Sequence, residues 1–539
     1  MQRALSRLSS EIFDVLIVGG GATGAFTARD AALRGLSVAL IEARDFAAAT
    51  SAHNSKLAHG GLRYLRNLEF KLVRESLRER RNLQAIAPHL LRPLPFLLPL
   101  TRSGERLKLA TGLALYDLLS FDRNRLDDPA QQMPGHRRLG RVAALAREPV
   151  LEAPGFAGAF EYHDAQMYSP ERIVLECLID ADAHGAAIAN HVAAKSLLLR
   201  SGKIEGCIVD DRMTGARFDI RARSVVLAAG PWADLFLEQA TGRAAAHKLI
   251  RSKGIHLLVP EISRSALTIE AQEISESGGH FFVLPWRGHT LLGTTDTAFS
   301  GDPERLGVSE ADIQGFLATI NRHLPAARQS RDRIEFFYAG LRPLVADGSK
   351  NSYTVSRRSE LVDHAGEGLD GLFSALGGKW TTSRALAERI TDALVKKLGR
   401  KAPSCATATT ALPGGRFDRF EPMVTGLEKT WPGIASIRHL AHMFGARLPA
   451  VLKGAKVSQL APLGPSGDTL VQISHAVQDE MALTLEDTVM RRTALGQFGR
   501  PDASVLEAAA SIMAAALGWT QTQKQQQIAN LDPLYRTIP

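Results

Sequence analysis

Short runs of apolar residues alternate with amphipathic stretches in the first part of the chain. Val15–Val18 and Val38–Ile41 are continuous apolar runs, which are typical of strands buried on both faces of a parallel sheet. The residues between these runs, from Ala22 to Arg34, are expected to form a helix that ends at Gly35. This pattern predicts a strand, a helix and a second strand at the start of an α/β domain.

Later segments of the chain also show apolar runs and amphipathic stretches. Apolar residues at helical spacing among arginines and glutamates predict a long amphipathic helix from Leu68 to Ile86. Residues 125–150 are rich in Asp, Arg and Pro and are predicted to be irregular. The remaining predictions are strands at 187–199, at 203–208 and from Ser224 into the string Ala228-Ala-Gly-Pro-Trp232, a mainly β unit at 250–345, and helices at 383–397, 424–429, 434–444, 473–496 and 505–517.

Glycines follow the first predicted strand in the spacing of a dinucleotide site. Gly19 allows a tight turn, Gly21 lets the backbone approach a pyrophosphate, and Gly24 lets the following helix pack closely on the strand. Glu42 closes the second strand, where an acid accepts the ribose hydroxyls of an adenosine. The position of the motif near residue 1 and the basic segment after the second strand favour FAD over NAD, and Glu42 argues against NADP.

The composition fits a globular protein of several domains. A chain of 539 residues is too long for one core, so about two or three domains are expected, and a hydrophobic fraction of 45% excludes a disordered class. The three cysteines have no CxxC spacing and indicate neither a disulfide framework nor a metal site. A net charge of +9 favours anionic partners, but no nucleic-acid module is recognised, so nucleic acid is not expected among them.

Residues 88–99 combine large apolar side chains with prolines and precede a cationic segment, residues 102–108. The sequence has no stretch of about 18 uncharged apolar residues, so no segment is expected to cross a bilayer. The region from Leu91 to Leu98 is open to two interpretations. It lies on the surface of a membrane, or it is a buried loop beside the sheet.

A polar loop from Thr50 to Leu65 follows the second strand and is suited to wrapping a cofactor. Its serine hydroxyls are donors, and its adjacent glycines permit close approach of the backbone. The strand that ends at Gly230 and the pair Gly377-Gly378 place two further helix starts near a bound anion, and the second would stabilise negative charge at flavin N1 and O2. The predicted cofactor-binding residues are Gly19, Gly21, Gly24, Glu42, Thr50, Ser51, Ser55, Gly60, Gly61, Val192, Gly230, Gly377, Gly378 and Thr381.

Several strings in the chain together resemble the FAD-dependent glycerol-3-phosphate dehydrogenases. The most specific is His59-Gly-Gly-Leu-Arg-Tyr64, within the string that runs from Ser55 to Leu65. The others are Ala229-Gly-Pro-Trp232, Lys253-Gly-Ile-His256, Gly293-Thr-Thr-Asp296, Leu341-Arg-Pro-Leu344, Gly377-Gly-Lys-Trp-Thr-Thr382 and the C-terminal segment 480–493. The resemblance runs from about residue 12 to about residue 400 and continues through the C-terminal helices.

This resemblance implies an α/β fold with a glutathione-reductase-type FAD-binding Rossmann domain, a β-rich substrate domain and a C-terminal helical domain. The expected boundaries are 12–90, 170–250 and 335–400 for the FAD-binding segments, 91–169 and 251–334 for the substrate-facing segments, and 410–530 for the helical domain. It also implies oxidation of sn-glycerol 3-phosphate to dihydroxyacetone phosphate, with electrons passing to membrane quinone. A cytoplasmic protein held peripherally on the inner face of the cytoplasmic membrane is expected, and a homodimer is an option.

Carried over residue by residue, the resemblance implies three catalytic residues, His256, Arg342 and Lys379, and three substrate-binding residues, Arg63, Tyr64 and Arg357. Oxidation of a secondary alcohol needs a hydride acceptor, a base for the hydroxyl proton and a clamp for the phosphate. His256 is the best base because its unperturbed pKa is near working pH, and a core histidine is the alternative interpretation. A guanidinium suits both phosphate and a developing alkoxide, and Lys379 suits the phosphate or flavin N1.

Two segments depart from the pattern of the family, Tyr168-Ser-Pro-Glu171 and residues 121–153. They leave the exact substrate open, because related enzymes of the family oxidise other polyol phosphates. An FAD-dependent oxidase is a second hypothesis, which the lack of an obvious extra insertion disfavours. A non-catalytic FAD-binding regulator is a third hypothesis, although such a protein would not need the histidine and the arginines together.

Overall fold

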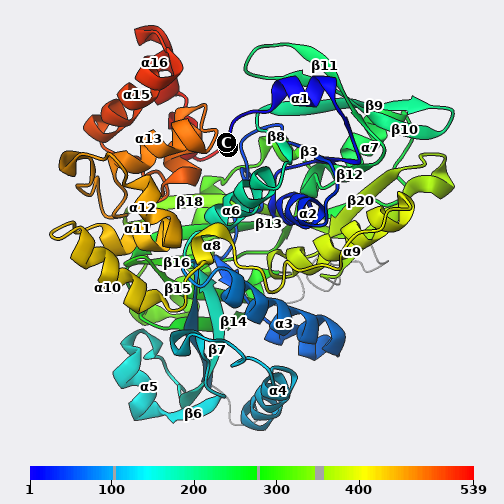
Figure 1. Ribbon diagram of the computed structural model, residues 1–539. Helices are drawn as coiled ribbons and strands as arrows, with labels where there is room; N and C mark the ends of the chain where they lie inside the picture. The colour runs from blue at the N-terminus through cyan, green and yellow to red at the C-terminus, as the bar shows by residue number, and fades with distance from the viewer. Residues whose placement is uncertain (101–104, 276–278, 346–356) are drawn as a thin grey trace.

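The computed structural model describes residues 1–100, 105–275, 279–345 and 357–539 (Figure 1). Within these residues, six strands form a central sheet in the order β19-β20-β12-β2-β3-β8. The sheet is parallel except for β19, which joins its edge antiparallel to β20. The strands are β2 (Val15–Val18), β3 (Val38–Ile41), β8 (Ala187–Ala189), β12 (Val225–Leu227), β19 (Ser359–Asp363) and β20 (Leu372–Gly377).

The central sheet is covered on both faces, which explains its continuous apolar runs. Val15 and Ile17 pack against the helices α2 (Ala22–Leu33), α6 (Pro170–Ala183) and α9 (Ser383–Lys397). Leu16 and Val18 face a smaller sheet in the order β1-β11-β10-β9. That sheet and its flanking helices are α1 (Leu5–Ser10), β1 (Ile12–Phe13), β9 (Val192–Arg200), β10 (Lys203–Asp211), β11 (Arg217–Ala222) and α7 (Ala233–Thr241). The predicted strand, helix and strand at the start of the chain are confirmed.

A second, larger sheet is mixed and contains ten of the described strands. Helix α8 (Glu310–His323) packs on one face. The other face is covered by α3 (Phe70–Ile86), α4 (Glu105–Leu119) and C-terminal helices. The strands are β4 (Leu57–Ala58), β5 (Leu91–Leu100), β6 (Arg137–Gly140), β7 (Gly158–Met167), β13 (Leu249–Pro260), β14 (Ala266–Ala271), β15 (Gly279–Trp286), β16 (His289–Gly293), β17 (Thr297–Ala298) and β18 (Phe336–Val345).

The segment Leu91–Leu98 is neither a membrane-surface segment nor a loop, and both interpretations of it were wrong. It forms most of β5, which pairs antiparallel with β7 along its whole length and parallel with β14 at Phe96 and Leu97. Its large apolar side chains are buried in the cores on the two faces of the sheet. Proline is tolerated because β14 covers only a short part of β5. Of the cationic segment that follows, residues 102–104 lie outside the described residues.

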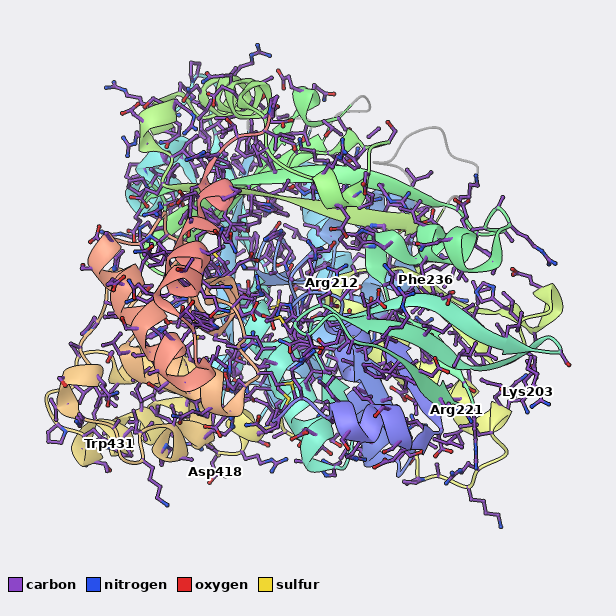
Figure 2. The ribbon with its side chains drawn as sticks, turned by 90° about the horizontal axis from the view of Figure 1, so that it is seen from above. Lys203, Arg212, Arg221, Phe236, Asp418 and Trp431 are labelled. Carbon is purple, nitrogen blue, oxygen red and sulfur yellow. The ribbon has the colours of Figure 1, made fainter. Side chains whose placement is uncertain are left out.

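The C-terminal region is helical, as predicted, and its last helices pack on the large sheet. Figure 2 places Asp418 and Trp431 of this region away from Lys203 and Arg221 of the small sheet. The helices are α10 (Phe420–Thr430), α11 (Ile437–Phe444), α12 (Leu448–Val451), α13 (Leu470–Asp479), α14 (Leu485–Asp487), α15 (Ala503–Leu517) and α16 (Gln521–Ala529).

Three local predictions were wrong. The predicted helix 473–496 breaks after Asp479, because Glu480 turns inward to pair with the buried Arg172 at 2.5 Å and Met481 adopts a positive φ. The predicted strand 187–199 is two strands, since His191 has a φ of 55° between them. Residues 125–150 contain β6 and α5 (Arg141–Arg147). Among the helices described, none is both long enough and apolar enough to span a bilayer.

Candidate active site

A cavity of about 720 Å³ begins at the carboxyl ends of β2 and β3 and reaches the large sheet. This edge is where open α/β sheets bind their ligands. The predicted site residues line the cavity, with the exceptions of Gly24 and Gly60. Gly24 serves packing as expected, because a Cβ there would lie 1.9 Å from the oxygen of Gly19. Gly60 differs from expectation: its N–H donates to Asp164, and a Cβ would collide with Leu77.

The end of the cavity at the central sheet fits FAD. Gly19 has a φ of 117°, and a side chain there would lie 2.5 Å from the oxygen of Ala228. The carboxylate of Glu42 accepts bonds from the N–H groups of Gly20 (2.7 Å) and Arg44 (2.9 Å), which hold it at the end of β3, where it is predicted to meet a ribose. The indole N–H of Trp232 is buried and has no hydrogen-bond acceptor among the described residues. A buried donor of this kind calls for a ligand atom.

His256 lies at the other end of the cavity, on β13. Its ring stacks on Tyr338 with centroids 4.9 Å apart, and Nε2 lies 2.9 Å from the hydroxyl of Ser55. Gly293 makes room for it, since a Cβ there would lie 2.4 Å from the imidazole. Burial, and then the positive charge of Arg342, hold the pKa of His256 well below its usual range. The choice of His256 rested on the unperturbed pKa of histidine, and its surroundings here favour the neutral imidazole, which is the form that accepts a proton.

Asp296 lies against two of the predicted arginines, Arg342 and Arg357. Arg342 on β18 donates to the hydroxyls of Ser252 (2.9 Å) and Thr294 (2.8 Å), and its guanidinium lies 3.9 Å from Asp296. Arg357 is buried and pairs with the same carboxylate at 3.3 Å. Asp296 ends the string Gly293-Thr-Thr-Asp296, but no role was predicted for it. The signal was a carboxylate at the end of a glycine-threonine string.

Tyr64 lies among three more of the predicted residues. The Lys379 ammonium is 4.5 Å and the Arg63 guanidinium 5.3 Å from the centroid of its ring. Burial raises the pKa of Tyr64, but Lys379, Arg63 and Arg357 outweigh it, so the pKa lies below its usual range. Burial lowers the pKa of Arg357 to about 10, with Arg63 and Arg342 contributing. These shifts show a region of strong positive potential, suited to an anion.

The predicted hydroxyl donors of the polar loop make other contacts. Ser51 caps α2 by accepting from the N–H of Ala22 at 2.9 Å, Thr50 donates to the oxygen of Leu341 at 2.7 Å, and Ser55 contacts His256. All three still line the cavity. Their contacts with a cofactor remain predictions.

Several side chains that form the cavity wall at its adenosine end were not predicted from the sequence. The Arg44 guanidinium stacks over the ring of Trp232 at 5.0 Å. Arg212 and Phe236 also line the cavity, and both are labelled beside the small sheet in Figure 2. They come from separate turns and helices, so no local pattern in the sequence groups them.

A dinucleotide site that opens onto a buried neutral histidine and a group of cations is the arrangement of a FAD-dependent oxidoreductase. The family model of that description, FAD dependent oxidoreductase, matches residues 14–393. The model for the C-terminal domain of alpha-glycerophosphate oxidase matches residues 405–524.

Similar proteins of known name identify the family within this class of oxidoreductases. The chain is 36% identical to a glycerol-3-phosphate dehydrogenase of Synechocystis sp., over 98% of this chain and 97% of the relative. It is 31% identical to an aerobic glycerol-3-phosphate dehydrogenase of Staphylococcus saprophyticus, over 96% and 93%. A solved glycerol-3-phosphate dehydrogenase from Bacillus halodurans, complexed with FAD, superposes with a TM-score of 0.79 at 28% identity, over 99% and 96%. The chain belongs to the FAD-dependent glycerol-3-phosphate dehydrogenase family.

Replacing Glu42 by alanine should weaken FAD binding by about 1–3 kcal/mol, the cost of leaving ribose hydroxyls without an acceptor. FAD affinity of the purified protein, measured by flavin fluorescence, checks this. Glu42→Gln keeps one acceptor oxygen and should lose less. Undiminished affinity in Glu42→Ala would remove Glu42 from the site.

Proposed function

We propose that the chain oxidises sn-glycerol 3-phosphate to dihydroxyacetone phosphate. The reaction removes a hydride from C2 and a proton from its hydroxyl. FAD, when bound, supplies the hydride acceptor. The observation that carries the proposal is the joining, in one cavity, of a neutral histidine and the cations Arg63, Arg342, Arg357 and Lys379. The names of the relatives support the same substrate.

His256 is the proposed base. One nitrogen of a neutral imidazole carries no proton and accepts the hydroxyl proton of the substrate. Ser55 orients the ring through Nε2, and Tyr338 holds its plane. Because these two contacts fix the buried ring, the imidazole meets the substrate hydroxyl in one orientation.

The arginines are proposed to divide the substrate between them. Arg357 and Arg63 pair with the dianionic phosphate, which cannot be buried without cationic donors. Arg342 lies nearest to the base and steadies the developing alkoxide. Lys379 Nζ is buried and has no hydrogen-bond partner within the described parts of the chain, so a phosphate oxygen or flavin N1 would satisfy it.

Anaerobic addition of sn-glycerol 3-phosphate tests the proposal. Flavin absorbance at the oxidised maximum should bleach, and a short-chain quinone should restore it faster than oxygen does. No bleaching would favour a regulator, and faster recovery with oxygen would favour an oxidase. A higher kcat/KM with another polyol phosphate would reassign the substrate.

We also propose that the face of the protein formed by α4 lies on a membrane surface and that the protein meets its quinone there. Leu107, Leu118 and Phe121 are 77%, 69% and 66% exposed, and Arg106 and Lys108 are exposed beside them. Leu109 of the same helix lines the cavity, which supports entry from this side. Apolar and basic side chains together suit the surface of an anionic bilayer. Peripheral attachment to the inner face of the cytoplasmic membrane, and a homodimer, remain part of the proposal.

The division into FAD-binding, substrate-facing and helical segments is kept as a proposal as well. The central sheet draws its strands from the proposed FAD-binding segments. Within those segments, β4 and β18 pair instead with strands of the large sheet. They carry the polar loop and Arg342 toward His256.

Charging two exposed leucines should weaken membrane binding. Each leucine at the headgroup boundary is worth roughly 1–2 kcal/mol, so Leu107→Asp with Leu118→Asp should lower partitioning onto anionic liposomes about 10-fold or more. Cosedimentation at low salt measures this. Val457→Asp, at a site that is 75% exposed in the C-terminal region, is the matched control and should bind normally. Equal binding of all three proteins would contradict the assigned face.

A further inference from the structure

We propose that the C-terminal domain positions the adenosine-side wall of the FAD site through a buried cluster of charged residues. The cluster, called the Asp45 latch here, consists of Asp45, His191, Asp487, Arg491 and Arg492. The part of that wall concerned is the segment 43–49, which follows Glu42 and includes Arg44. The inference concerns FAD retention and does not depend on which substrate is oxidised.

Asp45 joins the FAD-binding region to the C-terminal domain. Its side chain is fully buried, and both carboxylate oxygens are bound by guanidinium groups. Arg492 donates to Oδ2 at 2.7 Å and to Oδ1 at 2.8 Å, and Arg491 donates to Oδ2 at 2.7 Å. Asn190 also bridges the two parts, donating to Asp45 at 3.0 Å and to the oxygen of Met481 at 2.8 Å. Charge-assisted bonds of this number fix the carboxylate in one orientation.

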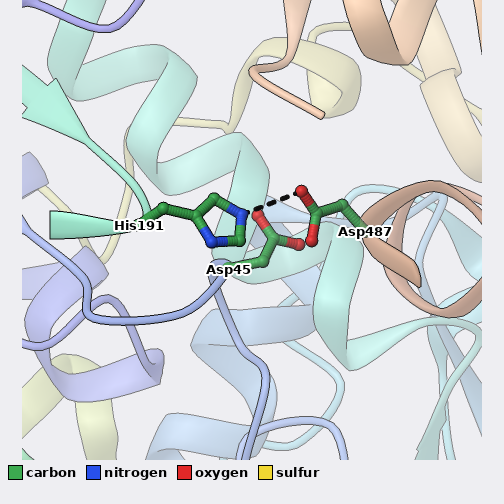
Figure 3. A group of neighbouring side chains, drawn as sticks. All are labelled: Asp45, His191 and Asp487. Atoms are coloured by element: carbon green, nitrogen blue, oxygen red, sulfur yellow. Dashed lines mark hydrogen bonds and ion pairs between the residues drawn. The ribbon is translucent and has the colours of Figure 1, made fainter. Parts of the chain in front are cut away.

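A second contact lies next to the first. His191 Nε2 is 3.0 Å from Oδ2 of Asp487, and Figure 3 shows the imidazole directed at this carboxylate with Asp45 beside it. Asp487 is held in turn by Arg491 at 3.0 Å and by the N–H groups of Leu483 and Thr484, which directly precede α14. His191 is fixed from its backbone as well, because its N–H donates to the oxygen of Arg44 at 2.8 Å.

Only a few residues of the chain separate Asp45 from residues that line the cofactor site. Asp45 faces the C-terminal domain, whereas Arg44 and Ala47 line the cavity. The N–H of Arg44 donates to the carboxylate of Glu42, and the oxygen of Glu42 accepts from the N–H of Val192. Releasing Asp45 would therefore loosen the segment 43–49 and, through the N–H of Arg44, one of the two bonds that orient the carboxylate of Glu42. FAD affinity is thereby coupled to docking of the C-terminal domain.

The same side chains do not suit a metal ion. Ligand atoms of Asp45, His191 and Asp487 lie within 4.8 Å of one another. However, the two carboxylates already pair with the charges of Arg491 and Arg492, and both oxygens of Asp45 are occupied. A divalent cation placed there would lie beside the positively charged guanidinium groups of Arg491 and Arg492, which would repel it. The cluster is an ion-pair contact.

Arg492→Met tests the latch. FAD release from the holoenzyme, followed by the rise of free flavin fluorescence, should accelerate about 5–150-fold, the usual range of coupling between two sites. Leu506→Ala is the control, since Leu506 is fully buried in α15 and lies outside the latch. It should lower the Tm comparably without a comparable change in FAD release.

His191→Gln is the second variant, should Arg492→Met fail to fold. It removes the imidazole from Asp487 and leaves the arginines paired with Asp45, so a smaller acceleration of several-fold is expected. Hydrogen exchange of residues 485–492 in the same holoenzyme should rise. Release within twofold of the parent, or an equal acceleration in Leu506→Ala, would overturn the proposal.

Discussion

Replacing His256 by alanine should slow anaerobic flavin reduction by glycerol 3-phosphate about 10²–10⁴-fold, the usual worth of a positioned base. FAD content should stay unchanged, because His256 lies at the far end of the cavity from Glu42. Ser55→Ala removes only an orienting contact and should cost less. His53 is the competing base: it lines the cavity, and burial lowers its pKa to about 3. Fast reduction in His256→Ala with slow reduction in His53→Ala would transfer the role to His53.

The pH dependence of flavin reduction follows from the same residue. The pKa of His256 lies well below 6.5 because of burial and then Arg342, so the imidazole is unprotonated at and above neutral pH. Activity should therefore be retained as the pH falls to 6.5 and should decline only when the pH passes through the lowered pKa. Stopped-flow reduction rates measured well below saturating substrate give the acidic limb of the free enzyme, which is the form whose pKa is lowered. A limb at or above pH 6.5 would contradict the neutral-base proposal.

Arg357→Ala should cost about 2–5 kcal/mol in kcat/KM for glycerol 3-phosphate, the range for breaking a buried charged pair. The trace rate with unphosphorylated glycerol should change little, because no phosphate is then left unpaired. Asp296 stays paired with Ser252 and Arg342 in this variant, so the site should remain folded. Steady-state kinetics on both substrates measure the difference.

Two further variants sharpen this test. Arg358 is the neighbour of Arg357, but its side chain is 63% exposed, so Arg358→Ala should leave kcat/KM unchanged. Arg342→Ala should impair both substrates, because Arg342 is also proposed to steady the alkoxide. Equal losses on the two substrates in Arg357→Ala would show that this residue does not bind the phosphate.

Much of the dinucleotide site follows from short stretches of chain. The apolar runs of β2 and β3, the spacing of Gly19, Gly21 and Gly24, and the place of Glu42 depend on contacts among neighbours in sequence. The helix α9 was predicted with its observed bounds, Ser383–Lys397, for the same reason. Local periodicity and glycine turns carry this information.

Other features depended on residues distant in sequence. The apolar segment 91–98 was compatible with a membrane or a loop until β7 and β14 paired with it. The periodicity of 473–496 continued past Asp479, but the buried Arg172 drew Glu480 out of the helix. In each case the local pattern was degenerate, and a partner brought by the fold selected one outcome.

The sequence by itself determined the class of protein, the cofactor and the residue types of the site. Only the tertiary structure decided the ion pairs and the pKa values of these residues. It placed Asp296 between Arg342 and Arg357, and it lowered the pKa of His256 by burying the ring beside a cation. It also brought Arg492 onto Asp45. A pKa and an ion pair depend on solvent exclusion and on charges from remote segments, and no local pattern encodes those.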